Sequence, residues 1–216
     1  MCKASDWSMI EVVEDFSPDH IHYARFSGNI RLGRFTREFE LAGGMKKHSG
    51  LYHVTLHNVT IGDDCCIENV KNYIANYEIG NSVFIENVDI ILTDCRSSFG
   101  NGVEVSVLSE TGGREVMIYD RLSAQTAYIM ALYRHRPEMV TRLRNIIGDY
   151  VQKVSSTVGK IGSNVVIADA GYIKNVKVGD WCKIEGASRL KNGSINSNEH
   201  APVHIGVNVI GDDFII

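Results

Sequence analysis

The sequence has few prolines, no long apolar run and no excess of basic residues. Only three prolines occur in 216 residues, so other residues must make the bends, and 20 glycines are available for them. No apolar stretch approaches the roughly 20 residues that cross a bilayer. Residues 1–7 also lack the apolar segment of a secretory signal. These absences predict a cytoplasmic protein without a membrane partner.

Charge and cysteine content exclude two further classes. The formal net charge of −4 argues against a nucleic-acid partner, because nucleic-acid-binding domains normally carry a basic face. The cysteines are odd in number and lack metal-ligand spacing. We interpret them as reduced and structural, as expected in the cytoplasm. They are Cys2, Cys65, Cys66, Cys95 and Cys182.

What the sequence does contain is a period of six residues nested in a period of eighteen. The pattern at 61–65 recurs at 79–83, and the pattern at 67–70 recurs at 85–88. Such a period fits neither a helix nor a simple strand alternation. It is typical of a chain that winds into a three-sided coil with one hexad per side. The positions expected to point inward are Ile61, Ile67, Tyr73, Ile79, Ile85 and Ile91.

Each residue of the hexad has a predicted role. The aliphatic residue stacks on its equivalent one coil away. The residue after it, Gly62 in one repeat, should lie in the bend, where a positive φ is best tolerated by Gly, Asn or Asp. Cys65 and Val83, four residues after the aliphatic one, should fill the narrow interior. Because no single coil closes a core, several must stack before the structure is stable.

A second motif, with Asn three residues before the aliphatic position, indicates where the coils run. It occurs at 29–33, 58–62, 76–80 and 175–179. We therefore predict coils over residues 28–107 and 156–216, after an N-terminal segment, 1–27, that shows little pattern. Phe99–Val103 resembles one more corner of the repeat, and residues 108–122 should form a hairpin turning at 111–114. Residues 34–50 should form a loop or hairpin outside the coil, with Gly43 and Gly44 at its turn.

Residues 123–155 break the period completely. Ser123 is suited to cap a first helix, and Pro137 suits the first turn of a second. We therefore predict a helical hairpin inserted into the coil. Its apolar faces fit packing or an oligomer contact, and its arginines leave open a lid or a basic wall for a phosphorylated ligand.

The Ile-Gly-x-x-Val hexads, with corners at 61, 79, 99, 161, 178 and 205, resemble the hexapeptide-repeat, left-handed parallel β-helix superfamily. The resemblance implies a mainly β fold made of three-sided coils. Over its whole length the chain also resembles the N-terminal part of a longer, uncharacterised bacterial family in that superfamily. Since the sequence stops at Ile216 inside a coil, we expect either further chain or a partner to cover this end.

Members of this superfamily are often trimers that act on small molecules. Many transfer an acyl group from acyl-CoA or acyl carrier protein, with a histidine as general base. The resemblance therefore implies a homotrimer, most plainly an acyltransferase with a sugar or sugar-nucleotide acceptor. Two alternatives stay open: a non-catalytic scaffold or binding module of a larger protein, and a domain associated with a sugar nucleotidyltransferase.

The candidate catalytic residues are His200 and His204. The segment 201–206 is similar to the strand that follows an acceptor-site loop in sugar O-acetyltransferases, although no histidine stands where those enzymes usually carry their base. His204 lies between Val203 and Ile205, which should point inward, so its imidazole should face outward. Either histidine would act as general base. Otherwise both are exposed surface residues.

Two further sets of polar residues are candidates for binding an acceptor or a metal ion. In the loop before His200, Asn196 and Asn198 are expected to orient the acceptor. The spacing of His48, His53 and His57, five and four residues apart, resembles that of metal ligands. Three ligands on one coil would project in different directions, so we predict no metal site.

Overall fold

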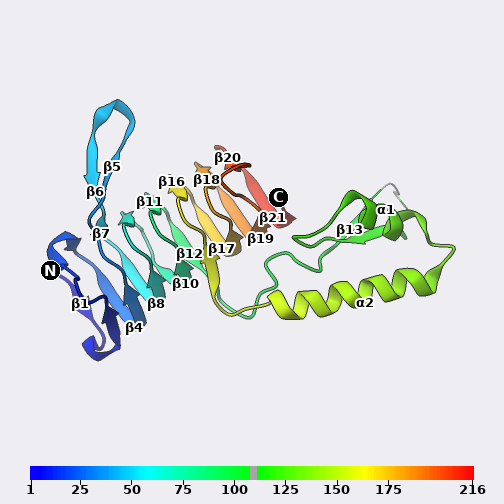
Figure 1. Ribbon diagram of the computed structural model, residues 1–216, viewed down its shortest axis with the longest axis horizontal. Helices are drawn as coiled ribbons and strands as arrows, with labels where there is room; N and C mark the ends of the chain where they lie inside the picture. The colour runs from blue at the N-terminus through cyan, green and yellow to red at the C-terminus, as the bar shows by residue number, and fades with distance from the viewer. Residues whose placement is uncertain (108–110) are drawn as a thin grey trace.

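The computed structural model describes residues 1–107 and 111–216, and it is mainly β (Figure 1). Two parallel sheets contain most of the strands. The larger sheet has, in spatial order, β1 (Lys3–Ala4), β4 (Arg25–Leu32), β8 (Thr55–Ile61), β10 (Ile74–Ile79), β12 (Ile90–Leu92), β17 (Tyr172–Val178), β19 (Arg189–Ile195) and β21 (Ile210–Ile215), joined by β2 (Ile10–Val12) and β15 (Gly159–Ile161). The smaller sheet has β20 (His204–Ile205), β18 (Lys183–Glu185), β16 (Val166–Ala168), β11 (Phe84–Glu86), β9 (Cys66–Glu68), β7 (Gly50–Tyr52) and β3 (Ile21–His22). The prediction of a mainly β chain is confirmed.

Neighbouring strands pair in the register that the repeat predicts. Ile61 lies opposite Ile79 in the larger sheet, and Ile67 lies opposite Ile85 in the smaller one. Their side chains are almost fully buried, as are those of Cys65 and Val83. Burial of one aliphatic side chain contributes roughly 1.5–3 kcal/mol. The stacked columns therefore supply most of the stabilisation of the sheets.

One expected inward position is wrong. Tyr73 is 39% exposed, and its neighbour Ile74 is fully buried instead. Ile74 pairs with Leu56 on one side and with Ile91 on the other, so it holds the place assigned to Tyr73. The reason is that the bend between β9 and β10 takes one residue more than a strict hexad allows.

The glycine of the repeat serves close packing rather than a positive φ. A Cβ on Gly62 would lie 2.8 Å from the carbonyl carbon of Gly80, and one on Gly80 would lie equally close to Gly162. Among the described residues, the positive φ values at this corner belong to residues two positions later, such as Asp64 (φ 58°) and Ser82 (φ 56°). The assignment of Gly62 to the left-handed bend is therefore wrong, because the stacked backbones exclude any side chain there.

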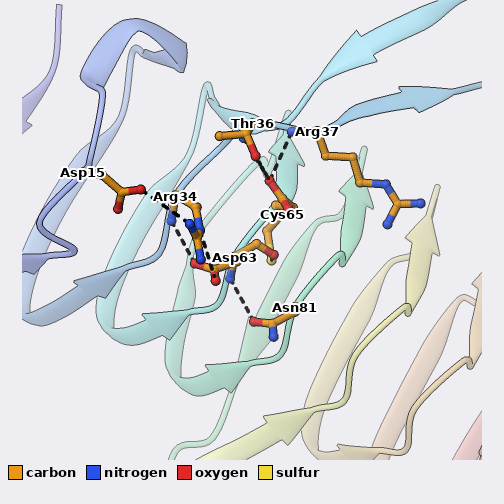
Figure 2. A network of polar contacts seen from close by, with 8 residues as sticks. Asp15, Arg34, Thr36, Arg37, Asp63, Cys65 and Asn81 are labelled. Carbon is orange, nitrogen blue, oxygen red and sulfur yellow. Dashed lines mark hydrogen bonds and ion pairs between the residues drawn. The ribbon is translucent and has the colours of Figure 1, made fainter.

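Polar side chains connect this corner from one repeat to the next (Figure 2). The Asn81 side chain accepts a hydrogen bond from the Asp63 N–H at 2.9 Å, and the Asp63 side chain accepts one from the Arg34 N–H at 3.0 Å. Thr36 and Arg37 bond Asp64 in the same network. These bonds satisfy backbone N–H groups that point along the stack.

The recurrence of Asn in the second motif has a similar cause. Asn58, Asn76 and Asn175 all adopt a positive φ, which Asn tolerates better than most residues. The Asn58 side-chain amide donates to Asn76 Oδ1 at 3.2 Å, and that of Asn76 donates to the Thr93 carbonyl at 2.7 Å. The motif therefore marks a second bonded corner.

Some interior positions pair an aromatic ring with a glycine. A Cβ on Gly159 would lie 2.4 Å from the Tyr77 ring, and one on Gly193 would lie 2.3 Å from the Phe214 ring. The hydroxyl group of the buried Tyr77 donates to the Val176 carbonyl at 2.8 Å. Each ring fills the space that the glycine leaves, so the column keeps its width.

The N-terminal segment belongs to the sheets although its sequence shows little pattern. β1 and β2 pair with β4, and β3 pairs with β7, all in parallel. The predicted hairpin outside the coil is confirmed: β5 (Glu38–Glu40) and β6 (Lys46–His48) pair antiparallel, with Gly43 and Gly44 at positive φ. Lys47 joins this hairpin to Glu68 and Glu86 at 2.8 and 2.7 Å.

The helical insertion is confirmed as a separate unit beside the sheets (Figure 1). It contains α1 (Ala124–Leu132) and α2 (Pro137–Val154), with Ser123 capping α1 and Pro137 in the first turn of α2. Within the described residues, neither helix is long and apolar enough to span a membrane. The insertion has a small core of its own, formed by Val116, Met130, Ala131 and Ile147.

Both ends of the insertion lie at one corner of the sheets. Leu92 pairs with Ala75, and Gly159 pairs with Tyr77, so the excursion replaces a single bend. Ser97 and Ser156 bond each other's backbone at 2.8 and 2.9 Å and hold the two arms of the stem together.

The interpretation of Phe99–Val103 as a further corner of the repeat is wrong. β13 (Glu104–Ser106) pairs antiparallel with β14 (Glu115–Met117), inside the insertion. The Phe99 carbonyl accepts a hydrogen bond from Ser194 Oγ at 2.7 Å, which fixes this segment against the outside of β19. Gly100 and Gly102 adopt positive φ in a loop. The resemblance of this segment to the repeat is therefore one of sequence and not of structure. Residues 108–110 of the expected hairpin lie outside the described residues.

Candidate functional site

The predicted catalytic region lies on the outer face of the smaller sheet, at its last strand. His204 pairs with Lys183 of β18, and its imidazole faces outward while Ile205 is buried. His204 Nε2 lies 3.0 Å from Glu185 Oε2, and Lys183 Nζ lies 2.8 Å from Glu185 Oε1. The structure therefore brings a histidine, a carboxylate and an ammonium group together on two paired strands.

The charges of this group favour a defined histidine tautomer. The hydrogen bond from Lys183, and then the contact with His204, lower the pKa of the Glu185 carboxyl. The carboxylate is therefore ionised at neutral pH and accepts the Nε2–H of the imidazole. A neutral imidazole that donates through Nε2 leaves a lone pair on Nδ1. His204 can then accept a proton at Nδ1 while Glu185 holds the ring.

The loop before His204 owes its shape to two polar side chains. Asn198 Oδ1 accepts from the N–H groups of His200 and Ala201 at 3.0 and 3.1 Å. Ser197 Oγ accepts from the Val203 N–H at 3.0 Å. Such side-chain-to-backbone bonds are how Asn and Ser stabilise turns. The oxygen of Asn198 is thus engaged in the turn, and its amide nitrogen is the group left to meet a ligand.

Asn196 does not lie with the other predicted site residues. Its side-chain amide donates to the Asp120 carbonyl of the helical insertion at 3.0 Å. Asn196 therefore connects the loop to the insertion, and the structure does not bring it beside His204. His200 is exposed on the loop. Of the four predicted site residues, His200, His204 and Asn198 share one region.

The insertion is attached to the sheets by a polar junction around Asp120. The Asp120 side chain is only 8% exposed, and its carboxylate lies 3.7 Å from Lys177 Nζ and accepts a hydrogen bond from the Tyr150 hydroxyl. Asn101 Oδ1 accepts from the Asp120 N–H at 2.8 Å. Burial, followed by Asp120, raises the pKa of Tyr150 to about 12. The Lys177 contact connects the insertion to β17, while the bonds with Tyr150 and Asn101 hold Asp120 within the insertion.

A separate groove lies on the outside of β2, β4, β8 and β10. It has a volume of about 650 Å³ and is lined mainly by polar side chains. Several of these bond one another, for example Arg31 with Glu11 at 2.7 Å and Asn58 with Asn76. Neither His200 nor His204 lines this groove. The groove and the histidine–carboxylate pair therefore lie in different places. Within the part of the chain that the structure describes, the His204 face is where a histidine side chain pairs with a carboxylate, so this face is the candidate site.

The other histidines have structural partners. His48 stacks on His20 with ring centroids 3.5 Å apart, and His53 stacks on Tyr23 at 4.7 Å. His57 Nδ1 lies 2.8 Å from Ser27 Oγ. Across residues 1–107 and 111–216, no group of three His, Cys, Asp or Glu side chains is arranged to hold a metal ion.

Two residues near His204, Glu185 and Trp181, were not predicted from the sequence as parts of the site. Glu185 becomes visible only once the strand register sets it against His204. Trp181 carries a signal in the sequence, because Asp64, Ser82 and Asn164 occupy the same place in earlier repeats. An alignment of the repeats by their corners would have found this exception.

The fold and this face define a mainly parallel-β protein with an exposed histidine–carboxylate pair on its smaller sheet. The model of the family described as "Domain of unknown function (DUF4954)" matches residues 1–216, and the chain belongs to this family. The chain is similar to an uncharacterized protein of Treponema pallidum (strain Nichols), with 27% identity over 214 residues. The match covers 94% of this chain but 29% of the relative, so the chain spans less than a third of that protein. No solved structure matches the chain.

Proposed function

We propose that the two sheets are the sides of one left-handed, three-sided parallel β-helix of the hexapeptide-repeat type. In support, the bent strands β8, β10, β17 and β19 turn at residues with positive φ, and each contributes to two sides. The smaller sheet supplies the third side. The eighteen-residue register between Ile61 and Ile79 fits one turn of such a coil.

We further propose that the chain transfers an acyl group from a thioester, acyl-CoA or acyl carrier protein, to a sugar or sugar-nucleotide acceptor. The observation that carries this proposal is the 3.0 Å contact between His204 and Glu185 on an open sheet face. A histidine held by a carboxylate is a common arrangement for a general base. His200 on the adjacent loop is the second candidate for that role.

The reaction assigns one task to each residue. His204 Nδ1 takes the proton of the acceptor hydroxyl or amine as its oxygen or nitrogen attacks the thioester carbonyl carbon. The new C–O or C–N bond forms, the C–S bond breaks, and the departing thiolate takes the proton from the imidazolium. Glu185 stabilises the imidazolium while it exists. Lys183 keeps Glu185 ionised.

A homotrimer fits this proposal because His204 faces outward. A neighbouring copy packed against the smaller sheet would cover the pair and exclude water, which strengthens electrostatic effects at the site. Sedimentation of the purified chain would report a mass of three protomers.

The test is thioester consumption with a panel of sugars and sugar nucleotides, measured for the wild type and for His204→Ala, Glu185→Gln and His200→Ala. We expect His204→Ala to lose about a hundredfold or more, as removal of a general base does. His135→Ala, an exposed histidine on the insertion, is the matched control. Full activity in both histidine variants, or no turnover by the wild type, would remove the assignment.

A scaffold or binding module of a larger protein is the second candidate function, and a sugar-nucleotidyltransferase-associated domain is one form of it. It is favoured by the way the hairpin β5–β6 and the insertion are fixed to the sheets by Lys47 and Asp120. Rigid side elements suit a protein that positions partners. Absence of thioester turnover together with partner binding that Asp120→Ala weakens would favour this function.

A further inference from the structure

Trp181 is an exception among the residues at its corner. Asp64, Ser82 and Asn164 are small and polar, and they hold the same positive φ that Trp181 holds at 58°. An aromatic residue in this region of φ is strained, since Gly, Asn and Asp tolerate it best. Tyr23, His53 and Phe99 share this φ elsewhere in the chain, but Tyr23 and His53 stack on each other and Phe99 is buried. The side chain is also 42% exposed, so burial does not offset the strain. A strained residue that gains little from packing indicates a role other than stability.

The place of Trp181 connects it to the candidate site. A Cβ on Gly179 would lie 2.5 Å from the Ser197 carbonyl oxygen and 2.6 Å from its nitrogen, so the loop at 196–201 starts directly on this corner. Two residues after Trp181, Lys183 pairs with His204. Trp181 therefore lies within two residues of Gly179, which packs on the start of the loop, and of Lys183, which pairs with His204.

We propose that Trp181 is the stacking platform for the pyranose ring of the acceptor, and this inference rests on the proposed function of the same site. An indole offers a flat apolar face at little cost in side-chain entropy, and it suits the C–H face of a sugar ring. The ring hydroxyls then meet polar groups at its edge: the Glu185 carboxylate, the Lys183 ammonium group and the Asn198 side-chain amide. Trp181 determines specificity for a cyclic sugar, and His204 provides the chemistry.

The proposal predicts that replacing Trp181 weakens sugar binding without lowering the stability of the fold. Trp181→Asn restores the residue type that Asn164 supplies one coil away, and Asn tolerates the positive φ. The variant should melt at the wild-type temperature or above it, and it should lose sugar binding. A residue kept only for structure would not give this combination.

The test uses binding without any thioester donor. The chain has two tryptophans, so Trp7→Phe leaves Trp181 as the only indole fluorophore. N-Acetylglucosamine, galactose and, as an open-chain control, sorbitol are titrated at millimolar concentrations. We expect a saturable change in emission with a ring sugar and none with sorbitol. Saturation-transfer NMR on the Trp7→Phe, Trp181→Asn variant should show binding weaker by about tenfold or more.

The outcomes separate this inference from the proposed function. Sugar binding through Trp181 without thioester turnover supports the platform and overturns acyl transfer. Turnover with no emission change, or with unchanged sugar signals in Trp181→Asn, overturns the platform alone. Emission that depends on protein concentration and not on sugar also overturns it, because Trp181 then packs against a second copy.

Discussion

The parallel sheets and the helical insertion are stabilised in different ways. In the sheets, aliphatic side chains such as Ile61 and Ile79 stack on their equivalents along the whole structure. The small core of the insertion is formed by four buried apolar residues, while Ile146 on α2 is 58% exposed. A long repeated core is cooperative, because each repeat depends on its neighbours. The insertion relies on a local core, so the two regions should respond differently to the same kind of change.

The attachment between the regions is polar rather than apolar. Asp94 bonds Lys174 and Asn175 where the insertion leaves the sheets, and the bond with Lys174 lowers the pKa of Asp94 to about 2. Asp120 bonds Tyr150 and contacts Lys177 further along. The contrast teaches that the insertion can be loosened by changes of charge that leave the sheets intact.

The largest effect should follow a charge placed in the stacked column. Ile79→Asp puts an unpaired carboxylate at a position that is 3% exposed, so we expect a loss of several kcal/mol in the free energy of unfolding. Both sheets should be lost together in thermal unfolding followed by circular dichroism. Ile79→Val, which costs roughly 0.5–1.5 kcal/mol in a core, is the control. A melting temperature within about 2 °C of wild type for Ile79→Asp would contradict the inward assignment.

A cavity in the insertion should have a local effect. Ile147→Ala removes a side chain that is buried in the small core, and such changes cost roughly 2–5 kcal/mol. Hydrogen exchange should become faster in α2 and stay slow in β8 and β10. Ile146→Ala, on the exposed side of the same helix, should change neither. Equal loss of protection in both regions would mean that they unfold as one unit.

The helical insertion should loosen internally at high pH, because Tyr150 of α2 donates a hydrogen bond to Asp120 within it. The pKa of Tyr150 is raised to about 12 from its usual value of about 10, so its contribution is fully present below pH 10 and is lost as pH rises through 12. We expect proteolysis within the insertion to accelerate over this range. Tyr150→Phe removes the hydrogen bond to Asp120, costs about 1 kcal/mol and should abolish the pH dependence. A variant that keeps the same pH dependence would refute this role.

The smallest effect concerns one corner of the repeat. Asn87 has φ 53° and donates a hydrogen bond to Asp169 at 3.1 Å. Asn87→Ala should cost about 1 kcal/mol or somewhat more, from backbone strain and the lost bond. Asn87→Gly tolerates the positive φ and isolates the loss of the bond. Denaturant midpoints of the two variants should therefore differ, with Ala lower; the reverse order would show that strain is not the main cost.

Periodic features of the fold could be predicted from the sequence because every repeat carries the same constraint. The small interior residues Cys65 and Val83 were correctly assigned from spacing alone, and both are fully buried. Capping by Ser123 was equally predictable, since it depends on neighbouring residues only. Local rules and strict repeats need no knowledge of distant contacts.

Features that depend on distant contacts were missed. The shift from Tyr73 to Ile74 arises because one bend takes an additional residue, which the hexad count cannot register. The Phe99 segment has the sequence of a corner, yet its position is fixed by the hydrogen bond that Ser194 donates to the Phe99 carbonyl. The N-terminal strands lack the repeat pattern and gain their register from β4 and β7.

The candidate site was predictable to the same limited degree. The outward direction of His204 follows from strand alternation next to the buried Ile205. Its partner Glu185 is set by the pairing of β20 with β18, across a loop of irregular length. Asn196 was assigned to the acceptor, whereas its bond to Asp120 depends on where the insertion folds back. Contacts between separate units carry no periodic signal.

The stem that leaves after Leu92 and returns at Gly159 has a consequence for protein engineering. The strands before and after it keep the register of β10, so the larger sheet is continuous on both sides of one bend. The backbone bonds between Ser97 and Ser156 bring the two ends of the inserted segment together. A gene in which a single asparagine replaces residues 93–158 should therefore still encode both parallel sheets, and the same bend should accept unrelated domains whose ends lie close together.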